Sequence, residues 1–260
     1  MTYTGRFVWY ELLTQDAEAA KAFYGEVFGW TTQPFGDGEK PYAIWHAGET
    51  PIGGVMEIQP EHEGSDFAPL WWAHVSVADV DEAARHAEAL GGKILTPATE
   101  IPEVGRFAVV ADPQGAMISL FKTNRDPTPP RDQMMIGSVG WHELNTSDHA
   151  SAWKFYSELF GWKHTTSMDM GPEWGTYFMF RHPDDPEDHS AGGMFDSAKH
   201  TGMDPKWLYY VNAPEMAPAI ERITALGGKV IVEPTEVPGG GKSAQALDPQ
   251  GVHFALFALK

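Results

Sequence analysis

The sequence predicts an α+β protein made by tandem duplication of a βαβββ-βαβββ module, with curved mixed sheets and helices on their outer faces. Three observations lead to this prediction. The chain contains an internal repeat, short strand-like runs alternate with amphipathic helical segments, and glycine or proline turns separate them. Hydrophobic residues make up 42% of the 260 residues, which is enough to form a packed core.

The repeat is visible as two blocks of matching sequence. Residues 8–30 (VWYELLTQDAEAAKAFYGEVFGW) match residues 140–162 (GWHELNTSDHASAWKFYSELFGW) at an offset of 132, since 141 − 9 = 132. Residues 69–121 match residues 205–257 at an offset of 136, since 205 − 69 = 136, and both copies contain LGGK and DPQG. Ungapped matching over such lengths indicates a duplication. We therefore predict modules at 1–123 and 134–260, joined by a polar, proline-rich linker at 124–133.

Each module shows the same order of expected elements. In the first module, a helix begins after Thr14 or Asp16 and ends at Gly29, and a second helix spans 80–90 and ends at Gly91. Strands are expected where β-branched and aromatic runs lie between turns, at 7–13, 30–35, 42–46, 52–58, 71–77, 93–96, 107–111 and 117–122. The second module is expected to repeat this order.

Composition excludes several classes of function. The 18 basic and 36 acidic residues give a net charge of −18, which repels nucleic acid and anionic membranes and attracts a cationic small molecule, or serves only to keep the protein in solution. There is no cysteine, no apolar run of membrane-spanning length and no secretory signal at MTYTGRFVWY, so we expect a cytoplasmic protein. The 10 Trp, 14 Phe and 8 Tyr residues favour an aromatic-lined site for a small molecule.

Two other motifs are expected to be structural. The pairs Gly53-Gly54 and Gly192-Gly193 lack the context of a phosphate loop, so they indicate close approach of backbone within strands. Residues 182–189, HPDDPEDH, resemble a metal-binding loop, but their density of Asp and Pro is more typical of a solvated loop.

The order of elements, the helix that ends in FYGEVFGW, the GGK after the second helix and the turn ADPQG together resemble the vicinal-oxygen-chelate superfamily. This superfamily includes glyoxalase I, bleomycin-resistance proteins and extradiol dioxygenases, and the duplicated chain resembles its two-module actinobacterial type. Its members include metal-dependent lyases, isomerases and oxygenases, and also metal-free proteins that sequester antibiotics. The fold alone does not decide between them.

The resemblance implies where a metal would bind in an enzymatic member, namely on the first, fifth and last strands of a module. The positions that correspond to the ligands are Trp9, Trp72 and Ser119 in the first module and Trp141, Leu208 and Ala255 in the second. None of these side chains is a good ligand for a divalent transition metal, and such a catalytic site usually needs three donors. We therefore expect no metal and no cofactor.

Neighbouring positions suggest the residues of a binding site, because residues two apart on a strand share a face. Glu11 and Glu143 follow the first-strand tryptophans by two residues and are candidate acid–base residues, or buried carboxylates with hydrogen-bond partners. A displaced metal site that uses Glu11 and His74 is an alternative. The expected ligand-binding residues are Trp9, Trp72, His74, Phe121, Trp141, Tyr210 and Phe257.

Two functions remain open. The first is a metal-free small-molecule-binding protein that holds an aromatic or polyketide-like ligand for sequestration, resistance or a biosynthetic accessory role, and the acidic charge favours a ligand that carries a cationic group. The second is a lyase, isomerase or oxygenase that uses a displaced metal or acid–base chemistry at Glu11 and Glu143. In both cases we expect a monomer whose two modules form a pseudo-dimer, because duplication supplies the partner that single-module relatives obtain by association.

Overall fold

The computed structural model describes residues 4–36, 41–58, 68–125 and 132–260. The first repeat contains β1 (Phe7–Thr14), α1 (Ala17–Phe28), β2 (Trp30–Phe35), β3 (Tyr42–Ala47), β4 (Thr50–Glu57), β5 (Leu70–Ser76), α2 (Val80–Ala89), β6 (Lys93–Ile101), β7 (Gly105–Ala111) and β8 (Met117–Thr123). These elements confirm the predicted order. Strand β6 is longer than expected, since it extends to Ile101 whereas the prediction ended at 96. Residues 126–131 of the predicted linker lie outside the described residues.

The second repeat follows the same plan with two additions. Its elements are β9 (Val139–Asn145), α3 (His149–Phe160), β10 (Lys163–Asp169), α4 (Gly171–Trp174), β11 (Thr176–Arg181), β12 (Gly192–Phe195), α5 (Ser197–Thr201), β13 (Lys206–Asn212), α6 (Met216–Ala225), β14 (Lys229–Glu236), β15 (Lys242–Leu247) and β16 (His253–Ala258). The short helices α4 and α5 were not predicted. Among the described residues, no helix is long and apolar enough to cross a membrane.

The strands form two mixed eight-stranded sheets with equivalent topology. The order is β2-β3-β4-β1-β5-β8-β7-β6 in the first repeat and β10-β11-β12-β9-β13-β16-β15-β14 in the second. The first strand of each repeat runs parallel to the fourth, so that Glu11 pairs with Gly54 and Glu143 pairs with Gly193. This register fixes which side chains of the two strands share a face.

Helix α1 begins and ends where its local sequence predicts. The Asp16 carboxylate accepts a hydrogen bond from the Ala19 backbone N–H, which caps one of the free donors of the first turn. Gly29 ends the helix with φ of 73°, in the left-handed region that favours glycine. Helix α3 repeats both features with Asp148 and Gly161.

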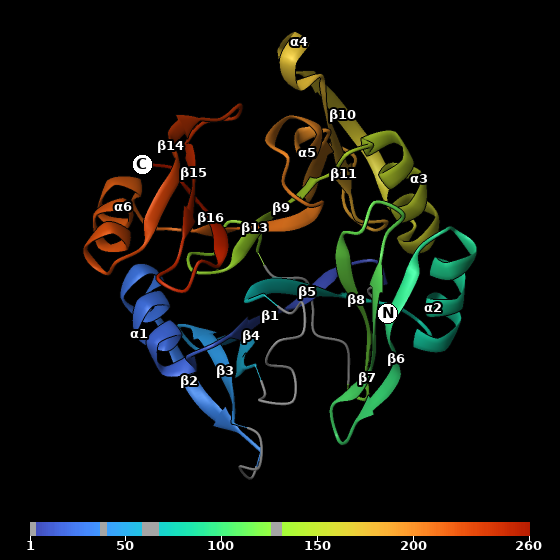
Figure 1. Cartoon of the computed structure of the whole chain (residues 1–260), viewed down its shortest axis with the longest axis horizontal. Helices are drawn as coiled ribbons and strands as arrows, with labels where there is room; N and C mark the ends of the chain where they lie inside the picture. Colours follow the sequence, from blue (N-terminus) through green and yellow to red (C-terminus); the bar gives the residue numbers. More distant parts are fainter. Residues whose placement is uncertain (1–3, 37–40, 59–67, 126–131) are drawn as a thin grey trace. The chain divides into compact units, whose positions relative to one another are not determined.

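The chain folds into two compact units that do not coincide with the repeats. Unit 1 comprises Met1–Val8, Trp72–Arg131 and Trp141–Trp207, and unit 2 comprises Trp9–Trp71, Asp132–Gly140 and Leu208–Lys260. Each unit therefore combines one half of the first repeat with one half of the second. In unit 1, α2 packs against α3, and in unit 2, α1 packs against α6, as the adjacent helices in Figure 1 show.

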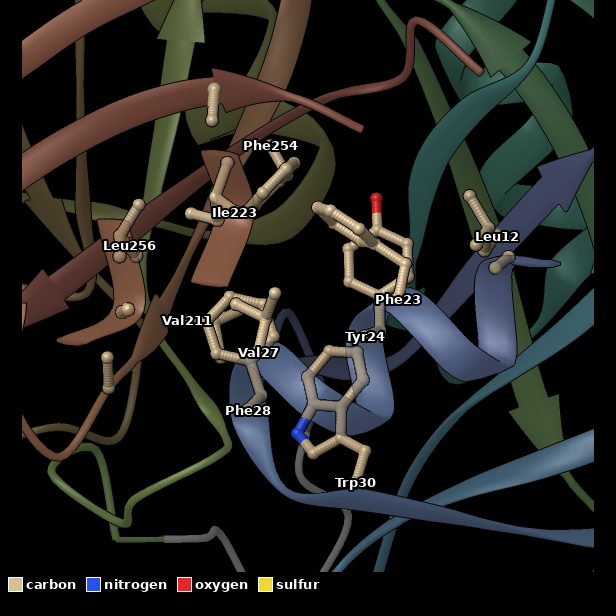
Figure 2. Packing of buried hydrophobic residues seen from close by; sticks show 14 of the residues in the cluster. Leu12, Phe23, Tyr24, Val27, Phe28, Trp30, Val211, Ile223, Phe254 and Leu256 are labelled. Carbon is tan, nitrogen blue, oxygen red and sulfur yellow. The ribbon is translucent and has the colours of Figure 1, made fainter. Parts of the chain in front are cut away.

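The core of unit 2 lies between α1 and strands of the second repeat. Phe23, Tyr24 and Phe28 from α1 pack with Phe254 from β16, and Trp30 follows immediately after the helix (Figure 2). Trp30 and its counterpart Trp162, which end the same motif in the two repeats, are both buried. Burial of large aromatic side chains is the main source of stability in such a core.

The turn DPQG and the helix motif FYxxxFGW are joined across the repeats within each unit. In unit 1, the Trp207 indole donates to the Tyr156 hydroxyl at 3.0 Å, and this hydroxyl donates to Asp112 at 3.0 Å. Asp112 also accepts the backbone N–H groups of its own turn, at Gln114 and Ala116. The two motifs that reveal the duplication thus contact each other in the folded chain.

Unit 2 contains the same chain of hydrogen bonds. The Trp71 indole donates to the Tyr24 hydroxyl at 3.0 Å, and Tyr24 donates to Asp248 at 3.2 Å. In addition, the Gln250 side chain accepts from the backbone N–H groups before α1 and donates to the Asp16 carbonyl. Each unit is therefore held together by contacts that neither repeat could form within itself.

Candidate functional site

The alternation of side chains on the first strand of each repeat separates core residues from site residues. In β9, His142 and Leu144 point into the aromatic core of unit 1, where the His142 ring stacks on Phe7 with 3.8 Å between centroids. Trp141 and Glu143 point to the opposite face of the strand. In β1 of unit 2, Leu12 belongs to the buried hydrophobic cluster, and its neighbour Glu11 faces the other way.

The first repeat places Trp9, Glu11 and Tyr42 in one hydrogen-bonded cluster. The Trp9 indole Nε1 donates to the Tyr42 hydroxyl at 2.9 Å and lies 3.0 Å from Glu11 Oε1. The Tyr42 hydroxyl donates to Glu11 Oε1 at 2.8 Å. Gly54 makes room for this arrangement, because a Cβ atom at this position would overlap the Tyr42 hydroxyl. Glu11 is 7% exposed, so its carboxylate is held in a largely dry environment.

The second repeat contains the same cluster, made by Trp141, Glu143 and Tyr177. The Trp141 indole donates to the Tyr177 hydroxyl at 2.9 Å, and this hydroxyl donates to Glu143 Oε2 at 3.0 Å. Gly193, which pairs with Glu143, leaves space that a Cβ atom would take from the Tyr177 ring. The three residue types and their order of hydrogen bonds are therefore kept in both copies, and we call them the Trp–Tyr–Glu clusters.

The chemistry of a Trp–Tyr–Glu cluster follows from its donors and acceptors. Burial, and then the negative charge of Glu11, hold the pKa of the Tyr42 phenol well above its ordinary value. Tyr42 therefore keeps its proton at neutral pH and acts as a hydrogen-bond donor that orients the carboxylate. A carboxylate fixed in this way can accept a hydrogen bond or a proton from a ligand.

Unit 1 places Trp72, His74 and Phe121 together. The Trp72 indole Nε1 lies 3.4 Å from His74 Nε2. The His74 ring lies edge-on to Phe121, with 5.5 Å between centroids, and His74 pairs with Ser119 across β5 and β8. These three residues were predicted to bind a ligand together with Trp9 and Glu11, which lie in unit 2, and a shared pocket stays a prediction.

Tyr210 and Phe257 lie in unit 2 on β13 and β16. Tyr210 pairs with Ala255 across these parallel strands, so Phe257, two residues further on, shares its face. The Gln245 amide donates to the Tyr210 hydroxyl at 3.0 Å, and Gln245 Oε1 lies 3.1 Å from His253 Nε2. The polar neighbours Gln245 and His253 were not expected from the sequence.

The positions that correspond to the metal ligands of the enzymatic relatives do not fit a metal. The indoles of Trp9 and Trp141 offer N–H donors rather than lone pairs, and both are engaged with tyrosine hydroxyls. The Ser119 hydroxyl is buried and donates to the Ala108 carbonyl at 3.2 Å. Within the described residues, there is no group of three or more His, Cys, Asp or Glu side chains that could hold an ion. The alternative metal site that would use Glu11 and His74 is likewise not supported by a third ligating side chain among the described residues.

Tyr42 and Tyr177 are the functional candidates that the sequence analysis missed. Nothing local distinguishes them from core tyrosines, because their role depends on strand pairing. One signal was available: both tyrosines precede a Gly-Gly pair by one strand, and the predicted close approach of backbone at these pairs is confirmed. Alignment by this pair, at an offset of 139 (192 − 53), places Tyr42 opposite Arg181 rather than Tyr177, so the two tyrosines are brought into correspondence only by strand pairing in the folded chain.

The histidine-rich segment 182–189 is not the fully solvated loop that was expected. His182 is buried, and its Nδ1 lies 2.8 Å from Asp185. Asp185 also forms an ion pair with Arg6. Burial opposes ionisation of Asp185, but hydrogen bonds from His182 and Arg6 outweigh it, so the pKa of Asp185 is below its usual value. Several proline-flanked carboxylates suggested solvent exposure, and the long-range partner Arg6 could not be seen in the local sequence.

The chain is similar to known proteins over almost its whole length. The chain is 29% identical over 254 residues to CFP32 of Mycobacterium tuberculosis, a protein named as a glyoxylase, with 95% of this chain and 92% of that protein covered. It is 27% identical over 271 residues to the anthracycline biosynthesis protein DauV of Streptomyces sp. strain C5, with 98% and 94% covered.

The fold is shared with solved structures at much lower identity. The 2,3-dioxygenase LapB from Pseudomonas sp. KL28 superimposes with a TM-score of 0.66 at 16% identity, over 99% of this chain and 93% of the other. The model of the Glyoxalase/Bleomycin resistance protein/Dioxygenase superfamily matches residues 6–120 and 137–256, which together make up most of the chain. The protein therefore belongs to the glyoxalase/bleomycin resistance protein/dioxygenase superfamily.

Proposed function

We propose that this protein binds a planar aromatic, polyketide-type small molecule at its Trp–Tyr–Glu clusters and does so without the divalent metal of its enzymatic relatives. The observation that carries the proposal is the duplication of the cluster. Trp9, Tyr42 and Glu11 are joined by the same order of hydrogen bonds as Trp141, Tyr177 and Glu143. In both copies, a tryptophan stands where the enzymatic members have their first metal ligand.

The cluster has the properties of a binding site for a flat, polar-edged ligand. Trp9 and Trp141 are partly exposed, while the carboxylates beside them are buried. An exposed indole face can stack on an aromatic ring, which contributes roughly 1 kcal/mol beyond the burial of area. The net charge of −18 favours a ligand that is neutral or cationic over an anionic one.

The named relatives support a role beside an aromatic polyketide. DauV is named as an anthracycline biosynthesis protein, and anthracyclines are planar, fused-ring polyketides. Because the similarity to DauV extends over almost the whole of both chains, we assign to this protein a role as an accessory or sequestering protein for a ligand of this kind.

Intrinsic fluorescence tests the proposal directly. A quinone or polyketide probe should quench the tryptophan emission saturably, and Trp9→Ala or Trp72→Ala should weaken its binding about tenfold, equal to about 1.4 kcal/mol. The melting temperature of the same variants is the control. If these tryptophans serve only the core, each substitution should instead cost roughly 3–5 kcal/mol of stability. Collapse of stability without any quenching of the wild type would rule the proposal out.

Metal analysis tests the second half of the proposal. Protein purified without a chelator should contain no stoichiometric transition metal, because the Trp, Leu, Ser and Ala side chains at the usual positions cannot bind one. Elemental analysis that finds about one Zn, Fe, Mn or Ni per chain, lost together with an activity, would contradict this expectation.

A second candidate function is acid–base catalysis at Glu11 or Glu143. The hydrogen bonds from Tyr42 and Tyr177 favour it, because they hold each carboxylate in one orientation beside a partly exposed tryptophan. A lyase or isomerase of this kind would lose turnover in Glu11→Gln or Glu143→Gln and keep its affinity for substrate. Equal loss of affinity in the same variants would favour the binding role.

A further inference from the structure

The second repeat adds an aromatic face and a polar side chain to its Trp–Tyr–Glu cluster, all within unit 1. Phe195, at the end of β12, lies two residues beyond Gly193 and therefore on the same face as Glu143. Its ring lies 5.3 Å from Tyr177 and 6.2 Å from Trp174, measured between centroids. Trp174 ends helix α4 and is partly exposed. The face thus extends from a buried carboxylate toward solvent.

Asn145 supplies the polar side chain. It lies two residues after Glu143 on β9, so both side chains point to the same face of the strand. Asn145 is 6% exposed, and its Oδ1 accepts a hydrogen bond from Ser197 at 2.6 Å. Its Nδ2 has no hydrogen-bond partner in the described structure. A buried amide N–H without an acceptor is costly, and a ligand carbonyl would satisfy it.

The first repeat differs at this position. The residue that corresponds to Asn145, at the offset of 132, is Leu13. A hydroxyl group alone would be recognised equally well by the carboxylates of both repeats, since Glu11 and Glu143 occupy equivalent positions. An acceptor group on the ligand would be recognised only by the second repeat, because a leucine side chain has no donor.

We propose that the second repeat selects a hydroxyquinone-type ligand, whose hydroxyl donates to Glu143, whose carbonyl accepts from Asn145 and whose rings contact the Phe195–Trp174 face. This inference rests on the proposed function and adds the ligand class and the repeat that recognises it. Tyr177 acts as a positioning residue, because its hydroxyl orients Glu143. A planar ring system that carries both groups satisfies the carboxylate, the amide and the aromatic face together.

Three matched probes separate the contributions of the ligand groups. 2,6-Dihydroxyanthraquinone carries both groups, 9,10-anthraquinone lacks the hydroxyls, and 2,6-dihydroxyanthracene, kept free of oxygen, lacks the carbonyls. Fluorescence titration of the full-length protein should show the first compound binding about tenfold more tightly than either of the others. The ratio of affinities is the readout, because a partly unfolded variant changes all three affinities by the same factor.

Variants assign each preference to a side chain. Glu143→Gln, made in a Glu11→Gln background so that the first repeat contributes no hydroxyl recognition, should abolish the preference for the hydroxyls, and Asn145→Leu, which copies the first repeat, should abolish the preference for the carbonyls. Tyr177→Phe should reduce the hydroxyl preference without affecting the carbonyl preference. Trp174→Ala should weaken all three compounds equally. Trp153→Phe is the control, since Trp153 packs on Phe178 on the opposite face of β11 and should change nothing.

The outcomes distinguish this inference from the proposed function. If the wild type is quenched saturably but the hydroxyl preference survives in the Glu11→Gln/Glu143→Gln variant and the carbonyl preference survives in Asn145→Leu, the inference is wrong and the proposed function stands. If the hydroxyl preference is lost in Glu11→Gln and kept in Glu143→Gln, the hydroxyl is recognised by the first repeat, and this result would also overturn the inference. If none of the three compounds quenches the wild type, the proposed function fails and the inference fails with it.

Discussion

Tyr156 connects three elements through a single hydroxyl group. This hydroxyl accepts from Trp207 and donates to Asp112, a residue that is 3% exposed. Tyr156→Phe would leave both partners without this bond while it keeps the ring in place. We expect a loss of about 1–3 kcal/mol in the free energy of unfolding, measured by urea denaturation. Tyr24→Phe, which removes the equivalent bond to Asp248, is the matched variant and should behave alike. A loss below about 0.5 kcal/mol in both would show that these bonds are not stabilising.

His142 makes stability depend on pH. Burial lowers the pKa of this histidine from 6.5 to about 3, although a hydrogen bond to the Ala191 carbonyl opposes the shift. The unfolded chain therefore takes up a proton at a higher pH than the folded chain. The free energy of unfolding should fall as the pH decreases from about 6.5 toward 3, by at most about 1.4 kcal/mol per pH unit from this residue.

The variant His142→Phe isolates this contribution. Phenylalanine can still stack on Phe7 but cannot be protonated, so the acid-induced loss should be smaller in the variant than in the wild type. Urea denaturation at several pH values between 7 and 4 measures the difference. His182, whose pKa burial also lowers, is present in both proteins and cancels in the comparison. Parallel pH profiles would contradict the assignment to His142.

Residues of the candidate site could be predicted from the sequence only in part. Strand alternation places Trp9 with Glu11 and Trp141 with Glu143, because period-two patterns are local. Their hydrogen-bond partners Tyr42 and Tyr177 come from other strands, and pairing register is not visible in a single strand. Asn145 was absent from the prediction for a different reason: the prediction considered the family's metal-ligand positions and the residues two further along, whereas Asn145 lies four residues after Trp141.

At the scale of elements, the capping residues fix where the first helix of each repeat begins and ends: an aspartate at the start and a glycine at the end. Gly29 has φ of 73°, and a Cβ atom there would have no neighbour within 4 Å. A substitution of Gly29 therefore changes stability only through the free-energy cost of placing a residue other than glycine in the left-handed backbone conformation. Gly29→Ala should reduce stability by about 1–2 kcal/mol, whereas Gly29→Asn should cost less because asparagine tolerates this conformation. Thermal unfolding of both variants checks the order, and an alanine variant as stable as the asparagine variant would refute it.

The helices α4 and α5 show the limit of local prediction. They have four and five residues, too few to display a helical period, and the four-residue increase in offset between the matching blocks was the only sign that the second repeat contains additional sequence. Both helices contribute to the site of the second repeat through Trp174 and Ser197. The strands and longer helices were predictable because their patterns extend over a full hydrophobic period and occur twice.

At the scale of the whole molecule, each compact unit needs both repeats. The Tyr24–Asp248 and Tyr156–Asp112 pairs join residues of different repeats. We expect residues 1–123 and 124–260, produced as separate chains, to lack the near-ultraviolet circular dichroism of the intact protein when each is alone. Mixing the two should restore it. A separate repeat that gives the full signal as a monomer would contradict the requirement for both.

The same packing leads us to expect a monomeric intact chain. Each repeat already contacts its partner inside the units, as the packing of α1 on α6 and of α2 on α3 shows. Sedimentation at micromolar concentration should give a mass of 28.7 kDa. Twice this mass would show that a further interface exists.

The division into units also has a consequence for synthesis on the ribosome. Most of unit 1 lies in two central stretches, Trp72–Arg131 and Trp141–Trp207, whereas most of unit 2 lies in two outer stretches, Trp9–Trp71 and Leu208–Lys260, with Asp132–Gly140 between the central ones. Helix α1 leaves the ribosome long before its core partner Phe254 is made, because Phe254 lies 226 residues after the end of the helix at Phe28 (254 − 28 = 226). At elongation rates of about 5–20 residues per second, the apolar face of α1 must wait about 11–45 s for that partner. During this interval, α1 is a natural binding site for a chaperone, and the central unit is the first part of the nascent chain able to fold.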